Sequence, residues 1–260
     1  MNRRDFLASS ALAGVAPLAQ ARALGTAPPV AAEYYELRRY HMLYGPKQRL
    51  LHGFMEEVAF PALGRLGLGP LGAFTVVYGP NSPSLYVLIT HKSLESVGTT
   101  RLRLAEDEAY RQAGADFLNR PMSDPAYVRY ESTLMKAFDQ MPALETPLQE
   151  DGRVFELRTY ESHSDAAALR KIEMFNRGGE IPIFRRTGLH PVFFAETVIG
   201  QNLPNLTYML VFEDLAARDE AWRQFGQDAD WVKLRADPYY ADTVSAISDL
   251  ILRPTAYSQI

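Results

Sequence analysis

The chain of 260 residues contains no cysteine, which excludes thiol nucleophiles, disulfide bridges and thiolate-bound zinc or iron–sulfur sites. Positive charge is not in excess either: the net charge is -4 at pH 7, so the composition has no basic footprint for nucleic acid. A phosphate loop, a dinucleotide fingerprint and a nucleophile elbow are also missing. The histidines show neither the i,i+4 nor the His-x-His spacing of zinc ligands. They are His41, His52, His91, His163 and His190. We therefore expect no metal site and no cofactor.

The first residues, 1–23, have the pattern of an export signal. The segment Arg3-Arg4-Asp5-Phe6-Leu7 resembles the twin-arginine signal of bacteria. The alanine-rich run that follows is too short to span a membrane, and small residues suit cleavage after Ala21 or Ala23. An N-terminal amphipathic helix is the alternative. The signal predicts a periplasmic or secreted protein that retains no membrane segment, with residues 24–32 as a loose leader.

One short stretch occurs twice in the chain. Glu36-Leu37-Arg38-Arg39-Tyr40 returns 120 residues later as Glu156-Leu157-Arg158-Thr159-Tyr160. Turn-forming and kink-forming residues recur at nearly the same interval, as in the pairs Pro61 and Pro182, Gly67 and Gly188, and Gly79 and Gly200. Glycine and proline restrict the path of the backbone, so their repetition indicates a repeated fold.

The hydrophobic periodicity predicts the same order of elements in each half. The expected strands cover 33–42, 73–78, 85–91 and 126–138, and then 154–161, 192–199, 206–213 and 244–252. Helices are expected from Pro46 to Gly64, from Ser93 to Asn119 with a break at Gly98, from Ser164 to Arg186 and from Leu215 to Arg235. The order β-α-β-β-α-β is that of a ferredoxin-like unit. We predict an α+β protein with units at 33–139 and 153–260, joined by a linker over 140–152 that is rich in proline and glutamate.

Both halves resemble the NIPSNAP family in the Glu-Leu-Arg-x-Tyr strand, the proline-containing helix that ends in glycine, the glycine-containing hairpin and the Asp-Pro after the second helix. The resemblance covers nearly all of the chain after residue 32. It implies the dimeric α+β barrel architecture, in which two ferredoxin-like units join their sheets. Because both units lie in one chain, we expect the barrel to close within it. A homodimer is the alternative, since unclosed sheet edges favour pairing with a second copy.

The repeated stretch supplies the first candidate site. If Leu37, Phe155 and Leu157 pack under the helices, alternation turns the polar residues into the barrel. These candidates for catalysis are Glu36, Arg38, Tyr40, Glu156, Arg158 and Tyr160. The arginines would bind a carboxylate or enolate, with a glutamate as base and a tyrosine as donor. The alternative is a Glu–Arg pair in each half that is closed internally and has a structural role.

Positions where the two halves differ are the second source of candidates. The positions of Arg39 and His41 in the first unit are taken by Thr159 and Glu161 in the second. Four residues of this kind are weaker candidates for ligand binding, namely His41, Tyr78, His91 and Glu196. His41 and His91 each close a strand, and because the two strands run antiparallel these ends are expected at opposite rims of the sheet, so a joint metal site is not expected.

Three functions remain open at this point. The first is an exported protein whose barrel cavity binds a small aromatic or carboxylated molecule, with or without enzyme activity that needs no cofactor. The second is a non-catalytic interaction module with a packed barrel. The third, haem binding, follows only from relatives within the wider barrel group.

Overall fold

The computed structural model describes residues 31–79 and 81–260. The expected signal over residues 1–23 and most of the leader therefore lie outside the described residues. Within the described ranges, no helix combines the length and apolar character needed to cross a bilayer.

Eight strands in the described residues close into one antiparallel barrel, in the order β1-β3-β2-β8-β5-β7-β6-β4. The first unit contributes β1 (Tyr34–His41), β2 (Leu71–Val76), β3 (Ser84–His91) and β4 (Arg129–Ala137). The second contributes β5 (Val154–Glu161), β6 (His190–Ile199), β7 (Asn205–Phe212) and β8 (Ala246–Pro254). The predicted α+β barrel built from two ferredoxin-like units is confirmed. Because the barrel closes within one chain, it has no free sheet edge in the described part, so the argument for a homodimer from open edges does not apply.

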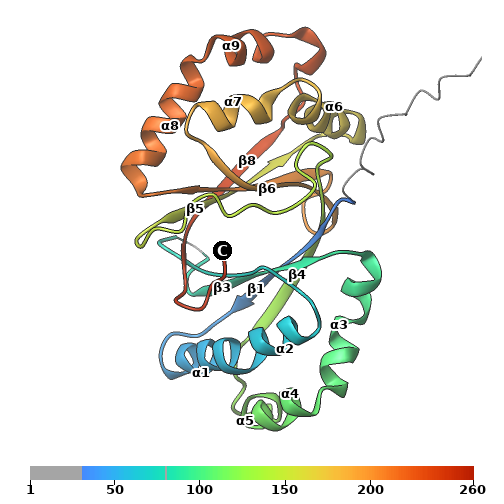
Figure 1. Ribbon diagram of the computed structural model, residues 1–260, viewed down its shortest axis with the longest axis vertical. Coiled ribbons are helices and arrows are strands. Elements are labelled where there is room, and N and C mark those ends of the chain that lie inside the picture. The colour runs from blue at the N-terminus through green and yellow to red at the C-terminus, as the bar shows by residue number, and fades with distance from the viewer. Residues whose placement is uncertain (1–30, 80) are drawn as a thin grey trace, which may run out of the picture.

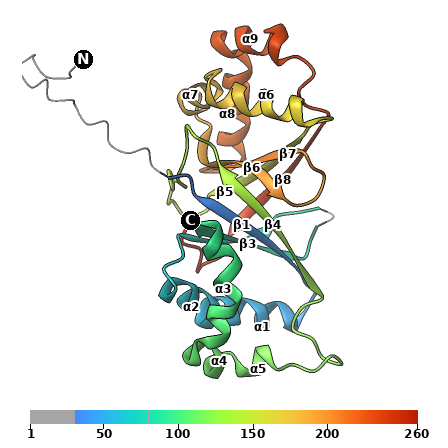
Figure 2. The same cartoon turned by 90° about the vertical axis from the view of Figure 1, so that its right-hand side faces the viewer.

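Helices cover the outside of the barrel in two separate layers (Figure 1). The first unit has α1 (Pro46–Phe54), α2 (Phe60–Arg65), α3 (Leu94–Glu106), α4 (Glu108–Ala113) and α5 (Ala115–Leu118). The second unit has α6 (Asp165–Asn176), α7 (Glu180–Arg186), α8 (Leu215–Gln227) and α9 (Ala229–Arg235), followed by a 3-10 turn at Pro238–Tyr240. In the turned view, the helices of each unit remain on the side of their own four strands (Figure 2).

Helix breaks differ in part from the expected positions. A π-helical segment, Met55–Ala59, joins α1 to α2 just before Pro61, whose missing N–H would interrupt a regular α-helix. Helix α3 runs through Gly98 to Glu106, and Asp107 follows it as the C-cap, so the predicted break at Gly98 is wrong. The helix expected to run unbroken to Arg186 is divided at Gly179, which has a φ of 88°.

The first turns of the long helices are capped as their sequences suggest. Ser93 accepts a hydrogen bond from the backbone N–H of Ser96 at the start of α3. Asp214 accepts the corresponding bond from Ala217 at the start of α8. The two caps are 214 − 93 = 121 residues apart, and both helices contain 13 residues. Helices α3 and α8 are therefore equivalent, residue by residue.

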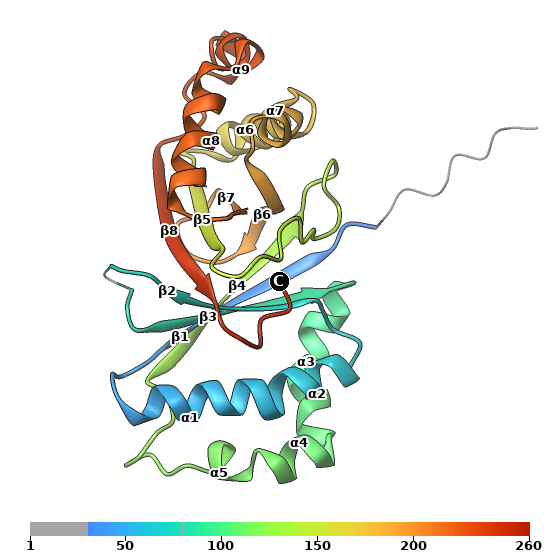
Figure 3. The same ribbon diagram turned by 60° about the vertical axis from the view of Figure 1, so that its left-hand side comes forward.

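The barrel interior is apolar at one end, where buried rings and aliphatic chains from both units meet. Among them are Tyr35, Phe74, Phe155 and Phe193. The linker is not a free spacer, because Leu144 and Leu148 pack against this cluster. Figure 3 shows the strands of both units around the common interior, with α1 and α2 outside. The linker thus covers the end of the barrel at which β1 begins.

The predicted orientation of the repeated strands is wrong. Leu37, Phe155 and Leu157 belong to the buried cluster inside the barrel. Tyr40 packs in the cluster between the sheet and the first unit's helices, and Glu156 bonds to side chains of α8. Both faces of each strand are buried here, so alternation alone could not distinguish the inner face from the helix-covered face.

Candidate functional site

Glu36 and Arg38 of the first unit bind each other and lie between the sheet and the helices. Arg38 donates from Nε and Nη2 to the two carboxylate oxygens of Glu36 at 2.7 and 2.8 Å. The Ser132 hydroxyl donates to the same carboxylate at 2.7 Å, and His91 Nε2 lies 3.7 Å from it. Burial raises the pKa of Glu36, but nearby His91 and the bonds from Arg38 outweigh burial and lower this pKa to about 2. A carboxylate held in this way is a poor general base.

The corresponding carboxylate of the second unit is fully buried and has other partners. Glu156 accepts one bond from Arg158 and two from Arg218, at distances between 2.6 and 3.0 Å. The indole Nε1–H of Trp222 donates to Glu156 Oε2 at 2.7 Å. Trp222 also covers Arg158, whose Cζ lies 4.6 Å from a centroid of the indole. The second unit therefore fills the space above its arginine with its own side chain.

The first unit has no tryptophan at the equivalent position. Helices α3 and α8 are equivalent at an offset of 121 residues in the sequence. Trp222 therefore corresponds to residue 222 − 121 = 101, which is Arg101. The Arg101 side chain lies at the surface, and the space beneath it is a cavity of about 340 Å³. We call this cavity the aromatic pocket.

The aromatic pocket lies between β1 and the helices α3, α4 and α5 of the first unit. Six of its thirteen lining residues are aromatic. Phe54 and Phe117 stack with their centroids 3.8 Å apart, and Tyr40 meets the ring of Tyr127 edge-on at 5.3 Å. Its lining consists of Arg38, Tyr40, Phe54, Met55, Arg101, Leu104, Ala105, Tyr110, Arg111, Phe117, Leu118, Tyr127 and Tyr130.

The polar groups of the aromatic pocket are cations and neutral phenols. Arg101 and Arg111 lie at its rim, and neither is within ion-pair distance of a carboxylate among the described residues. Burial raises the pKa of Tyr110 to about 12 and also raises the pKa of Tyr40 and Tyr127. These hydroxyls are therefore protonated donors at neutral pH. The pocket combines an aromatic wall with two available positive charges.

The remaining sequence candidates do not gather at this pocket. His41 bonds to Arg39 and to Glu131 Oε1 at 3.0 Å, at the end of the barrel opposite the linker. His91 is fully buried and bonds to Ser96 Oγ at 2.9 Å. Tyr78 is 93% exposed, and Glu196 is an exposed residue of β6. The structure therefore does not bring these four residues together.

The chain was compared with known families and proteins. The NIPSNAP family model matches residues 35–139 and again residues 155–259, which together form most of the chain. The chain belongs to the NIPSNAP family. A comparison with curated proteins found no match.

Solved structures extend the likeness of this NIPSNAP chain to the level of the fold. A monooxygenase-like protein from Lactobacillus acidophilus NCFM is 11% identical, with a TM-score of 0.57 and coverage of 86% of this chain and 94% of its own. Another from Fusobacterium nucleatum is 9% identical, with a TM-score of 0.54 and coverage of 86% and 93%. A NIPSNAP-like domain protein from Burkholderia xenovorans is 21% identical over 43% of this chain and 92% of its own, with a TM-score of 0.38.

The two cavities that residues of β1 help to line have no described histidine to hold a haem iron, and His190 lines a separate, smaller cavity of about 220 Å³. Described histidines line neither the aromatic pocket nor a second cavity, of about 280 Å³, at the end of the barrel where β1 and β5 end, although His41 contacts residues of the latter. Within the described ranges, no cluster of three or more histidine, aspartate or glutamate side chains is arranged to hold a metal ion.

Sequence reasoning found two pocket residues of this NIPSNAP chain, Arg38 and Tyr40, and missed the others. The missed cations and several of the missed rings come from α3, α4, α5 and the segment before β4, where the halves align least clearly. The other two missed rings are Phe54 at the end of α1 and Tyr130 in β4. One signal was present in the sequence: at the offset of 121 residues, the position of Trp222 in the second unit corresponds to Arg101 in the first. Its meaning required knowledge of what the tryptophan covers.

Proposed function

We propose that this NIPSNAP protein binds a small molecule that combines an aromatic body with a carboxylate, in the aromatic pocket of the first unit. One observation carries the proposal: the space that Trp222 occupies in the second unit is an open cavity in the first, lined by rings and rimmed by arginine. A concave apolar pocket with a few convergent polar groups is the usual form of a ligand site.

The arrangement of the lining suggests how such a ligand would be held. Its ring would pack among Phe54, Phe117 and Tyr127, in the offset or edge-on contacts that aromatic groups prefer. Its carboxylate would face the free guanidinium groups of Arg101 and Arg111, which bind carboxylates through paired N–H groups. Arg38 contributes less charge because Glu36 already neutralises it.

The proposed activity is binding rather than proton abstraction by the repeated motif. Glu36 and Glu156 both form ion pairs with arginine, and the low pKa of Glu36 makes it a very weak base at neutral pH. The phenols can orient a ligand oxygen by donating to it. The part of the chain described here thus supports recognition more strongly than catalysis.

Arg101→Trp tests the proposed function, because it copies the second unit's own means of filling this space. We expect the affinity for 2-naphthoate, measured by calorimetric titration, to fall by at least ~10-fold, since both volume and a charged hydrogen-bond partner are lost. Uncharged 2-naphthalenemethanol should bind the wild-type protein more weakly than 2-naphthoate.

The matched control is Arg103→Trp, which introduces the same ring on α3 at an exposed residue outside the pocket lining. It should bind 2-naphthoate as the wild-type protein does. Equal affinity of Arg101→Trp and wild type would contradict the proposal, as would equal binding of the carboxylate and the alcohol.

We also propose that the protein works in the periplasm or outside the cell. The support is the twin-arginine-like segment and the small residues around Ala21 and Ala23. Fractionation of bacteria that express the full chain, followed by N-terminal sequencing, should find an exported form that begins at residue 22 or 24. An uncleaved chain confined to the cytoplasm would refute the assignment.

A further inference from the structure

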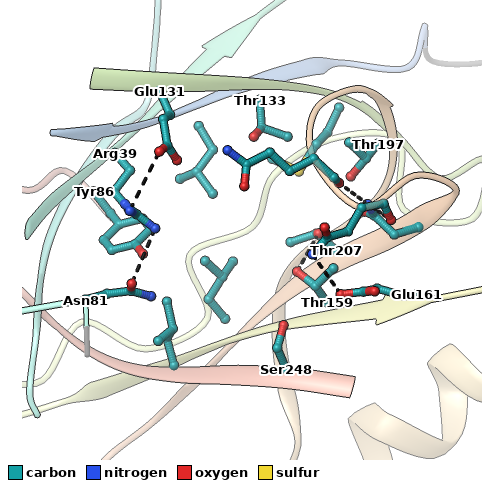
Figure 4. A pocket seen from close by; sticks show the side chains of 17 residues that line it. Arg39, Asn81, Tyr86, Glu131, Thr133, Thr159, Glu161, Thr197, Thr207 and Ser248 are labelled. Atoms are coloured by element: carbon teal, nitrogen blue, oxygen red, sulfur yellow. Dashed lines mark hydrogen bonds and ion pairs between the residues drawn. The ribbon is translucent and has the colours of Figure 1, made fainter. Parts of the chain in front are cut away.

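The open end of the barrel contains a second cavity, of about 280 Å³, where β1 and β5 end. We call it the barrel mouth. Its lining comes from both units and includes the two hairpin loops that carry Asn81 and Asn202. Figure 4 shows Arg39, Glu131 and Asn81 along one side and Thr159, Thr207 and Glu161 along the other. Alternation along β1 separates the two cavities, because Arg38 and Tyr40 line the aromatic pocket whereas Arg39 lines the mouth.

The two sides of the barrel mouth differ because the two copies of the motif differ. Arg39 lies opposite Glu131 on the neighbouring strand of the first unit. The equivalent pair in the second unit is Thr159 and Ser248, and the Thr159 hydroxyl also bonds to that of Thr207 at 2.9 Å. One side therefore carries an arginine–glutamate pair, whereas the other carries hydroxyl groups and the carboxylate of Glu161.

Thr197 and Asn205, two residues that line the barrel mouth, each hold a buried polar atom without a hydrogen-bond partner among the described residues. These atoms are Thr197 Oγ1 and Asn205 Oδ1. Thr197 is 6% exposed and Asn205 is 4% exposed. The orientation of the Asn205 amide is determined, because its Nδ2 donates to the carbonyl oxygens of Gln201 and Asn202. Its Oδ1 is consequently a free acceptor. Buried polar atoms of proteins are nearly always paired, so two unpaired atoms on residues of one cavity call for a partner. A ligand with complementary groups would supply one after a small shift of these side chains.

The charges and the floor of the mouth restrict the class of ligand. Arg39 is already engaged by His41, Asn81 and the nearby carboxylate of Glu131. With Glu131 and Glu161 also present, acidic groups outnumber the arginine, which disfavours an anion. The floor is apolar and consists of Leu37, Met135, Leu157 and Leu250.

We propose that the barrel mouth is a second binding site, for a neutral polyhydroxylated molecule of about monosaccharide size. Ligand hydroxyls would donate to Asn205 Oδ1 and Glu161, and would exchange hydrogen bonds with Thr197 and Ser248. The C–H face of a sugar or cyclitol ring would pack on the four apolar residues of the floor. This site is independent of the aromatic pocket, and either one can exist without the other.

The test is a titration of the ¹⁵N-labelled full chain with myo-inositol, with D-glucose and with myo-inositol 1-phosphate, followed by NMR. We expect saturable shifts for the two neutral probes that include the amides of Thr159, Thr197 and Ser248, and weaker binding of the phosphate. Tighter binding of the phosphate would overturn the assignment of ligand class. Absence of saturable shifts at these amides with every probe would overturn the site.

Thr197→Val removes the unpaired hydroxyl with little change of shape. It should weaken neutral-probe binding about 5-fold, which is typical of one lost hydrogen bond, while the midpoint of urea unfolding stays the same or rises. The control is Thr90→Val, because Thr90 is also buried but its hydroxyl donates to the Pro70 carbonyl outside the mouth. It should unfold at lower urea and bind the probes normally. Unchanged binding by Thr197→Val would overturn the role of this hydroxyl.

Discussion

Trp222→Ala is expected to lower the free energy of unfolding by ~3 kcal/mol, the lower end of the usual cost of truncating a large core ring, because Trp222 is partly buried. Trp222 makes three kinds of contact in the second unit. Its ring packs edge-on against Phe184 and Phe225, with centroids 5.8 and 5.6 Å away. It covers the guanidinium of Arg158, and its Nε1–H donates to the buried carboxylate of Glu156. The measurement is urea unfolding at neutral pH.

Trp222→Phe separates the hydrogen bond from the packing. It keeps an apolar ring over Arg158 and removes only the donor to Glu156, so its cost should be smaller, about 1–3 kcal/mol. A loss below ~1 kcal/mol for Trp222→Ala would show that the ring does not support this layer. It would also weaken the comparison with the open pocket of the first unit.

Glu36→Gln should lose less stability than the wild type as the pH falls from 7 to 3. The slopes of unfolding free energy against pH should differ most below pH 5. The folded-state pKa of Glu36 is about 2, against an ordinary value of 4.5. A carboxyl whose pKa is lowered by folding stabilises the protein above its unfolded pKa, and this contribution disappears as the pH falls through the folded pKa. The difference corresponds to about 3 kcal/mol, of which about 2 kcal/mol is lost by pH 3. At neutral pH the variant should be less stable, because Arg38 loses its charged partner.

The measurement compares urea unfolding of wild type and Glu36→Gln at pH 7, 5 and 3, so that other acidic groups cancel in the difference. Glu220→Gln is the control. Its pKa is also lowered to about 2, chiefly by hydrogen bonds from Arg223, but the pair is exposed and screened by water. If Glu36→Gln and wild type lose stability in parallel from pH 7 to pH 3, the buried pair does not make the proposed contribution.

Much of the architecture could be predicted because local signals agreed with each other. Alternation, turn residues and the repeated glycines and prolines located every strand to within a few residues, as at Val154–Glu161. Helix interruptions were harder to predict. Gly98 is tolerated within α3, whereas Asp107 ends that helix because its side chain caps the next one. An aspartate can be exposed, paired or a cap, and its tertiary neighbours decide among these roles.

The candidate site depended on information that a single strand does not contain. Alternation correctly separated Glu36, Arg38 and Tyr40 from Leu37, but it could not say which set faces the barrel. That assignment failed because the helices bury the outer face as completely as the barrel buries the inner face. The hairpin residues Asn202 and Asn205 and the helix residues of the aromatic pocket lie far from the motif in sequence. Only closure of the barrel and packing of the helices bring them to it.

By itself, the sequence determined the duplication, the order of elements and the family, because these rest on local backbone preferences that occur twice. The tertiary structure decided how the two copies of Glu-Leu-Arg-x-Tyr differ. In one copy Trp222 closes the space above the arginine, and in the other Arg101 leaves it open. Whether the space over the strand is filled depends on which side chain the neighbouring helix places there. That contact between helix and strand exists only in the folded chain.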